Sequence, residues 1–113
     1  MAGARQIGAG TLIFDEVDVG IGGGVAERVG RRLAEVGKSR QVLCITHLPQ
    51  VAAHATNHLR VRKREADNGS LTALDVIGGK ERVEEIARML GGVEVTDRTL
   101  AHAREMLAVE TNP

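Results

Sequence analysis

The feature that most constrains the fold of this chain is a short apolar run that ends on acidic residues, TLIFDEVDVG at residues 11–20. Residues 11–17 have the composition of a strand that is buried on both faces, as in a parallel sheet. Burial of a charge is costly unless the charge is paired or binds a ligand. The carboxylates of Asp15, Glu16 and Asp18 therefore indicate that this strand ends where the sheet meets water or a ligand.

The order of the elements that follow predicts a strand–helix–strand unit. Glycines at positions 20 and 22–24 predict a loop, and residues 41–46 (QVLCIT) predict a second buried strand, after which Pro49 opens a short helix. A strand, a helix and a strand in this order favour parallel pairing of the strands. The helix is predicted over residues 25–36, with an inner face of apolar residues at helical spacing, Val25, Val29, Leu33 and Val36.

The second half of the chain predicts a hairpin and two helices. Strands are predicted over residues 58–65 and 70–77, with a turn at Asn68-Gly69. A helix is predicted over residues 81–90, and Thr96 is predicted to cap a last helix. The inner faces of these helices are predicted from apolar residues at helical spacing, Val83, Ile86, Ala87 and Leu90, then Leu100, Ala103 and Leu107.

These elements predict an α/β fold with a partly parallel sheet, one β-hairpin and C-terminal helices. Residues 1–10, rich in glycine and alanine, are predicted to be a poorly ordered lead-in. Residues 11–109 are predicted to form one folded unit, and residues 110–113 a tail. A length of 113 residues suits one domain with a modest core.

The composition narrows the possible functions. Phe14 is the only aromatic residue among Phe, Trp and Tyr, which nearly excludes an aromatic surface that stacks on single-stranded nucleic acid. The 15 basic and 15 acidic residues cancel, so the net charge does not favour a DNA or membrane surface. The chain has a single cysteine, Cys44, so a disulfide within the chain is excluded. Cys44 itself is predicted to be a core residue. The absence of disulfides favours a reducing compartment, the cytoplasm. No apolar run approaches the roughly 20 residues of a membrane helix, and no signal peptide is evident.

Two strand ends predict a candidate catalytic site. Asp15 and Glu16 end the first strand of the unit and His47 ends the second, so they are expected at one edge of the sheet. In a nucleotide hydrolase, one carboxylate holds Mg²⁺ and the next activates the attacking water, while a histidine can bond the γ-phosphate. The alternatives are a solvated acidic turn and a structural histidine. Asp18 and Gly20 extend the same loop and could reach a subunit interface, or could form a simple turn.

One pattern resembles a phosphate-binding loop but does not fit it. Gly37-Lys38-Ser39 matches the end of GxxxxGKS, yet Arg32 occupies the position of the first glycine. The triplet also follows a predicted helix, whereas a phosphate loop begins one. We therefore do not expect this segment to bind phosphate.

Two further patterns favour surface positions over binding sites. His54 and His58 have the spacing of metal ligands on a helix, but no third ligand is evident and the helix is expected to end between them. Arg60, Arg62 and Arg64 share one face of a predicted strand. They could contact phosphate, although a solvated face or pairing with nearby acids is favoured.

Two segments together resemble a known family. TLIFDEVDVGIGG at residues 11–23 and QVLCITHLPQVAA at residues 41–53 resemble the ATPase head of the structural-maintenance-of-chromosomes and ABC superfamily, and within it the RecN family of bacterial DNA repair proteins. LIFDEVD resembles the Walker B segment, DVGIGG the D-loop, and THLPQVAAHA the switch-histidine region. ERVEEIARMLGG and TDRTLAHAREML resemble the C-terminal end of the same family, so the resemblance spans residues 11–107.

This resemblance implies the C-terminal lobe of an ABC/SMC-type P-loop NTPase head that uses ATP and Mg²⁺. By analogy, Asp15 would help to hold Mg²⁺, directly or through water, and Glu16 would be the catalytic base. Asp18 and Gly20 would belong to a loop that communicates across a dimer of two heads, and His47 would sense the γ-phosphate. The family repairs DNA double-strand breaks by recombination, which implies DNA as a partner of the parent protein and an association with the nucleoid.

The sequence also departs from the family pattern, because it holds neither a Walker A loop nor the signature motif that should precede Walker B. The resemblance therefore implies a C-terminal fragment that is not expected to hydrolyse ATP alone. Its expected partners are an N-terminal lobe with Walker A and a second ATPase head. No membrane is expected among its partners. One alternative is a non-catalytic binding module that pairs through its loop and sheet edge. Another is a fragment of a different ABC-type ATPase, which would usually carry a DEPT-like sequence after Walker B.

Overall fold

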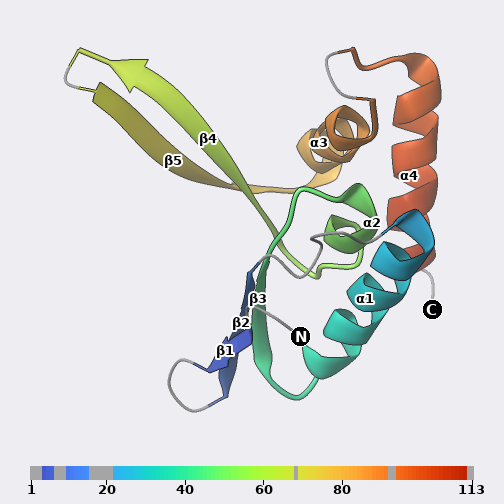
Figure 1. Cartoon of the computed structure of the whole chain (residues 1–113). Coiled ribbons are helices and arrows are strands. Elements are labelled where there is room, and N and C mark those ends of the chain that lie inside the picture. The colour runs from blue at the N-terminus through green and yellow to red at the C-terminus, as the bar shows by residue number, and fades with distance from the viewer. Residues whose placement is uncertain (1–3, 7–9, 16–21, 68, 92–93, 112–113) are drawn as a thin grey trace.

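The chain folds into a small sheet, a separate hairpin and a group of helices (Figure 1). The computed structural model describes residues 4–6, 10–15, 22–67, 69–91 and 94–111. In chain order the elements are β1 (Ala4–Gln6), β2 (Thr11–Asp15), α1 (Gly23–Val36), β3 (Gln41–Ile45), α2 (Pro49–Ala52), β4 (His58–Ala66), β5 (Gly69–Ile77), α3 (Gly79–Gly91) and α4 (Asp97–Thr111).

The sheet confirms the predicted strand–helix–strand unit. Strands β2 and β3 pair in parallel, from Thr11 opposite Gln41 to Asp15 opposite Ile45. Strand β1 pairs antiparallel with β2 and completes the order β1-β2-β3. The sequence did not predict β1, because its residues 4–6 (ARQ) have no apolar alternation and become a strand only by pairing with β2.

Both strands correct the prediction that they are buried: every residue of β2 is only half-buried, and the residues of β3 alternate between half-buried and exposed. Val42 and Cys44 pack toward α1, but the alternate side chains of Leu43 and Ile45 are 42% and 53% exposed. Side chains alternate across a strand, so a helix that packs on one face leaves the other face open. The apolar run of this strand therefore places hydrophobic side chains on a surface.

The core consists of two clusters of mostly small aliphatic residues, and α2 contributes to both. The first cluster joins α1 to α2, and the second joins α2 to α3 and α4. The apolar faces predicted for α3 and α4 are confirmed, since they pack in the second cluster. The buried residues of the first cluster are Ala26, Leu33 and Val51, and those of the second are Ala52, Ala53, Ile86, Ala87 and Ala103.

Helix α1 begins two residues before its predicted start, and its predicted inner face is confirmed in part, because Val29 and Leu33 pack in the first cluster. Its buried residues are Ala26, Gly30 and Leu33, whereas Val25, predicted to face inward, is 41% exposed. At Gly30 the segment after β3 approaches α1 closely. A Cβ atom on Gly30 would lie 2.9 Å from the Gln50 carbonyl oxygen and 3.1 Å from the Val51 Cα.

Two sets of hydrogen bonds fix the ends of the helices. The Thr96 hydroxyl accepts a bond from the Thr99 backbone N–H at 3.2 Å, which confirms the predicted cap of α4. The Thr99 hydroxyl accepts a bond from the Thr96 N–H at 2.9 Å in return. At the end of α2, the Arg82 guanidinium donates to the carbonyl oxygen of Ala55 at 2.6 Å, so α3 is tied to α2.

The hairpin confirms the predicted antiparallel pair, with His58 opposite Ile77 and Ala66 opposite Gly69. Of its predicted arginine face, Arg60 and Arg62 are paired with acids, as the sequence favoured, and the side chain of Arg64 lies outside the described part. Asp75 lies 2.7 Å from Arg62 and 3.4 Å from Arg60, and the hydrogen bond from Arg62, followed by the charges of both arginines, lowers the pKa of Asp75.

The base of the hairpin holds a half-buried histidine, His58. Burial is the main cause that lowers the pKa of His58 below its ordinary value of 6.5, and the positive charges of Arg82 and Arg60 add to it, against an opposing effect of Glu85. The buried Nδ1 of His58 has no hydrogen-bond partner among the described residues, which disfavours the doubly protonated ring. The folded chain therefore favours neutral His58.

We predict that replacing Gly30 with alanine destabilises the fold, although alanine favours helices. The alanine Cβ would meet backbone atoms of Gln50 and Val51, and such overpacking costs about 1–3 kcal/mol, against a helix-propensity gain of about 1 kcal/mol. The expected net loss is about 1 kcal/mol, measured by urea unfolding. The control is Gly24→Ala in the same helix, where a Cβ meets no atom within 4 Å, so stability should be unchanged or rise. Equal effects of both variants would contradict the packing argument.

We also predict that His58 makes the stability of the chain depend on pH. The folded pKa is lowered, so the unfolded state binds the proton first, and stability falls as pH drops through the unfolded value of 6.5. Urea unfolding of the chain and of His58→Gln between about pH 7.5 and about pH 5.5 isolates this effect. The chain should lose more stability on acidification than the variant. A pH-independent difference between the two would show that His58 does not couple to folding.

Candidate functional site

The candidate site lies at the edge of the sheet where β2 and β3 end. Asp15 is the last residue of β2 and lies opposite Ile45, the last residue of β3, in the parallel register. His47 follows Ile45 by two residues. The structure therefore places Asp15 and His47 at the same end of neighbouring strands, where ligands bind in open α/β sheets.

The other predicted site residues lie outside the described part of the chain. Glu16, Asp18 and Gly20 lie between β2 and α1, outside the described residues. The helix after them begins at Gly23, with Gly22 as an N-terminal cap that makes no side-chain hydrogen bond. The structure thus brings together Asp15 and His47 of the predicted set.

His47 lies in a short loop that is anchored on both sides. The Thr46 hydroxyl accepts a hydrogen bond from the Leu48 backbone N–H at 3.0 Å, which closes a local turn around His47. Leu48 packs against the first core cluster, and Pro49 then opens α2 in its favoured first position. The side chain of His47 is exposed, and Asp15 is half-buried. A ligand at the sheet edge can therefore reach the imidazole while the backbone beside it is held.

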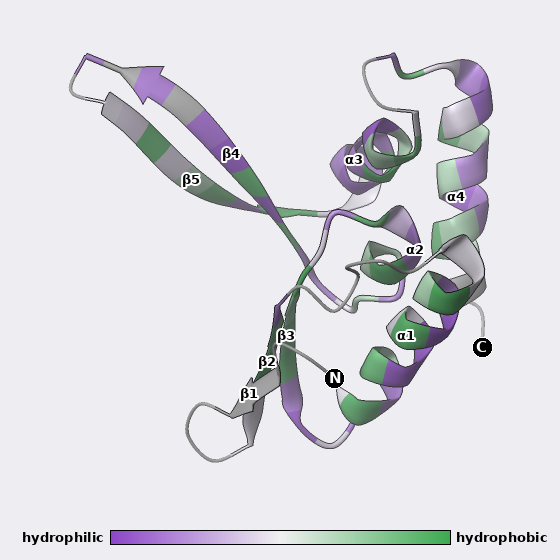
Figure 2. Ribbon diagram, in the orientation of Figure 1, coloured by the Kyte–Doolittle hydropathy of each residue, from purple (hydrophilic) through white to green (hydrophobic). Residues whose placement is uncertain are grey.

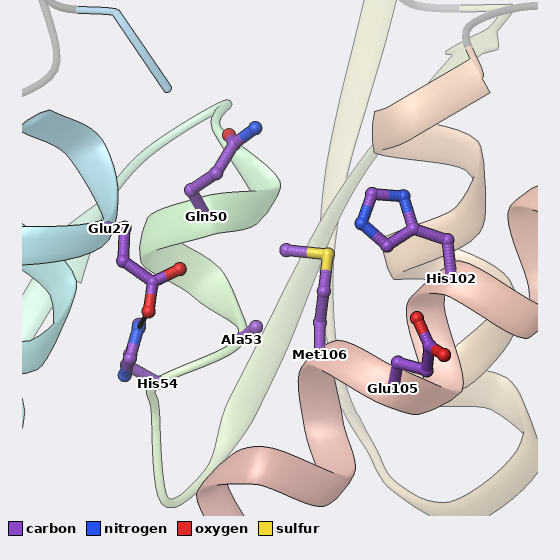
Figure 3. Close-up of a pocket in the computed structure, with 7 residues that line it drawn as sticks. All are labelled: Glu27, Gln50, Ala53, His54, His102, Glu105 and Met106. Atoms are coloured by element: carbon purple, nitrogen blue, oxygen red, sulfur yellow. Dashed lines mark ion pairs between the residues drawn. The ribbon is translucent and has the colours of Figure 1, made fainter. Parts of the chain in front are cut away.

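A second group of polar side chains surrounds a cavity of about 200 Å³ between α1, α4 and the segment around α2 (Figure 3). In this group the Glu27 carboxylate points toward the His54 ring, with 3.5 Å between Oε1 and Nε2. His102 and Glu105 on α4 lie on the other side of Met106 (Figure 3). No group of three or more His, Cys, Asp or Glu side chains in the described part of the chain is arranged to hold a metal ion.

His54 corrects the surface position that the sequence favoured. Its side chain is buried, with 6% of the residue exposed, and α2 ends at Ala52, before both His54 and His58. The histidine spacing alone could not reveal this burial. The signal that could have done so is the combination of Gly30 on α1 with the small residues 52–53, which allow the backbones to approach closely.

The position of Gly37-Lys38-Ser39 agrees with the prediction that this segment is not a phosphate-binding loop. Gly37 follows the last residue of α1, and its backbone N–H donates to the Leu33 carbonyl oxygen at 2.9 Å. Gly37-Lys38-Ser39 therefore ends a helix, as predicted, and presents carbonyl groups rather than the free N–H groups that bind phosphate.

The described elements define a mixed α/β protein built on a parallel β2–α1–β3 unit with C-terminal helices. Among the described residues, no helix is both long and apolar enough to cross a membrane. No family model matches the chain.

Curated proteins do match it, and they are DNA repair proteins RecN. RecN of Xylella fastidiosa (strain 9a5c) is 50% identical over 97 residues, which cover 86% of this chain and 17% of that protein. RecN of Halalkalibacterium halodurans is 45% identical over 105 residues, 93% of this chain and 19% of that protein. RecN of Mycobacterium tuberculosis (strain H37Rv) is 44% identical over 113 residues, 99% of this chain and 19% of that protein.

These matches confirm the resemblance to RecN. Over most of its own length, this chain is similar to a segment of DNA repair protein RecN. The chain spans less than one fifth of the length of these curated relatives.

Proposed function

We propose that this chain supplies the Walker B and switch-histidine residues of a RecN-like ATPase that acts in DNA double-strand break repair by recombination. One observation supports this best: the parallel register of β2 and β3 puts Asp15 and His47 at the same sheet edge. The similarity to RecN, at 44–50% identity, supports the repair role. A second ATPase head and DNA are then partners of the parent protein. The cytoplasmic location stays a prediction.

The residues at this edge fit the chemistry of Mg²⁺-ATP. Magnesium prefers oxygen ligands and usually takes only one or two carboxylates, with phosphates and water completing its shell. Asp15, a half-buried carboxylate at the end of β2, suits that role without a further acidic cluster. Bound Mg²⁺ would neutralise charge on the phosphates. In this proposal His47 donates a hydrogen bond to the γ-phosphate.

The remaining roles fall on residues outside the described part. Glu16 would accept a proton from the attacking water, because it follows Asp15 directly. Asp18 and Gly20 would carry the contact to a second head. The sequence has no Walker A loop, and such a loop supplies most contacts to the phosphates. We therefore propose a half-site that needs an N-terminal lobe.

An exposed apolar face supports such a partner. We use this name for Leu43 and Ile45 of β3 with Leu59, Val61, Leu74 and Val76 of the hairpin, which are 42–79% exposed. Most of them line one groove of about 600 Å³. Figure 2 shows hydrophobic segments on both strands of the hairpin, which projects beyond the helices. A contiguous exposed apolar surface of this kind marks a protein interface.

The hairpin itself needs a partner for stability. A lone two-stranded hairpin is at best marginally stable in water. On the apolar face Val61 lies opposite Leu74 and Leu59 opposite Val76, so the cross-strand pairs are hydrophobic but uncovered. We propose that the N-terminal lobe of the parent ATPase covers this face.

The apolar face also favours a second candidate function, a binding module without catalysis. In that case the chain would pair with an N-terminal lobe or another head while contributing nothing to nucleotide chemistry. The two functions differ in whether the assembled pair binds Mg²⁺-ATP through Asp15. A fragment of a different ABC-type ATPase is disfavoured by the identity with RecN.

We predict that the chain alone neither binds Mg²⁺-ATP tightly nor hydrolyses it, and that binding appears when an N-terminal lobe of a RecN protein is added. Isothermal titration calorimetry measures the binding of Mg²⁺-ATP to the chain alone and to its mixture with the N-terminal lobe. Asp15→Asn should weaken Mg²⁺-ATP binding in the mixture by at least about tenfold, because it removes a magnesium ligand. The matched control is Asp97→Asn at the start of α4, which should not change it. Tight binding by the chain alone, or ATPase activity of the chain alone that Glu16→Gln abolishes, would contradict the half-site.

A second prediction tests the apolar face. Val61→Glu combined with Leu74→Glu places two carboxylates on the apolar face, which a partner would have to bury unpaired, so binding of the N-terminal lobe should weaken by at least about tenfold. The control, Ala73→Glu, adds a carboxylate on the opposite face beside Arg62 and should leave binding intact. Equal binding by both variants, measured by calorimetry, would exclude this face as the interface.

A further inference from the structure

A junction between α1 and α2 links the two strand ends of the candidate site. Helix α1 follows the segment after Asp15, and α2 follows the loop that holds His47. Helix α2 has four residues, so it cannot fix its own position and depends on what it packs against. Val51 packs with Ala26 and Leu33 of α1, which sets the separation of the two helices.

Glu27 and Gly30 lie one turn apart on α1, and both face the segment of residues 50–54. Gly30 allows the close approach, since a Cβ there would lie 2.7 Å from the Cδ2 atom of His54 and 2.9 Å from the Gln50 carbonyl oxygen. Glu27 adds a polar contact, with 3.5 Å between its Oε1 and the Nε2 of His54 (Figure 3), and the same Oε1 accepts a hydrogen bond from Arg31 at 3.0 Å. The junction therefore holds the segment after α2 by shape and by a polar contact.

His54 is suited to holding this segment in place, because moving its buried ring into solvent would break its packing contacts. Its side chain is 4% exposed, whereas the Glu27 carboxylate is 42% exposed. The far side of the same segment is held by Arg82, which donates to the Ala55 carbonyl oxygen at 2.6 Å. A shift of α2 along α1 would break the Glu27–His54 contact and pull on Leu48, the residue directly after His47.

We infer that Glu27 and His54 are positioning residues for His47. Strand β3 holds the loop on one side, through its register with β2 and Asp15. The junction holds it on the other side, through α2. The contact of Glu27 with His54 therefore helps to hold the orientation of the His47 loop relative to Asp15, in addition to the Thr46–Leu48 hydrogen bond and the packing of Leu48. The consequence for catalysis rests on the proposed function, whereas the positioning itself does not.

The test uses nuclear magnetic resonance of the full 113-residue chain without nucleotide. In His54→Leu and Glu27→Gln, the resonances of the His47 ring and the Leu48 amide should shift. The Leu48 amide, which donates to the Thr46 hydroxyl, should exchange with solvent about tenfold faster than in the unmodified chain. His54→Gln, which keeps a hydrogen-bond donor toward Glu27, should restore most of the original values.

The control is Glu35→Gln, the same substitution on the same helix, which removes only the exposed pair with Arg32. It should leave the His47 and Leu48 resonances unchanged. If His54→Leu does not fold, Glu27→Gln decides alone, because that carboxylate is half exposed. Unchanged His47 and Leu48 signals in Glu27→Gln would overturn the inference, and so would an equal shift in Glu35→Gln.

A second readout separates this inference from the proposed function. In a mixture with an N-terminal lobe of a RecN protein, Glu27→Gln should lower kcat for ATP about tenfold with little change in KM, because it displaces a residue that acts on the transition state. Absence of ATPase activity in the unmodified mixture would count against the proposed function. The resonances of His47 would still decide the positioning inference.

Discussion

The parallel pairing of β2 with β3 is the contact on which the rest of the molecule depends. Parallel strands cannot be joined by a tight turn, so α1 must cross over and pack on one face of the pair. The same pairing makes both strands end at one edge, which brings Asp15 and His47 to the same place. The candidate site is thus a consequence of strand direction, and an antiparallel arrangement would have separated these residues.

The second constraint is the small size of the side chains around α2. The buried residues there are mainly alanines, with Gly30 on the facing helix, and the largest fully buried side chain in the described part is Ile86. Small side chains let backbones approach closely, but each one buries little apolar area. The position of α2 therefore depends on shape and on specific polar contacts, those of Arg82 and of Glu27 with His54.

The periodic parts of the sequence predicted the fold well. The helices, the strands of the hairpin and the parallel pair follow from apolar spacing and element order. Of the predicted turn, Gly69 is the first residue of β5, opposite Ala66, and Asn68 lies outside the described residues. Three features could not be predicted, because they depend on tertiary contacts. Strand β1 exists through pairing alone, Gly30 joins the inner face of α1 where the segment of residues 50–54 approaches closely, and His54 is buried by its neighbours.

The exposure of one face of β3 could not be predicted from the sequence for a different reason. A strand of uniformly apolar residues indicates burial on both faces, but it cannot tell whether the second cover lies within the same chain. Here Val42 and Cys44 face α1, while Leu43 and Ile45 line a groove with the hairpin. The segment similar to this chain is less than one fifth of each curated RecN, so these relatives have ample further chain to supply a cover.

The two faces of the hairpin differ in whether their side chains have partners within the described part of the chain. On one face Arg60 and Arg62 are paired with Asp75 within the chain. On the other face the apolar side chains remain exposed, and their groove continues onto Leu43 and Ile45 of β3. Ile45 lies two residues before His47. A partner that covers this groove would therefore contact the strand that leads to His47, close to the candidate site.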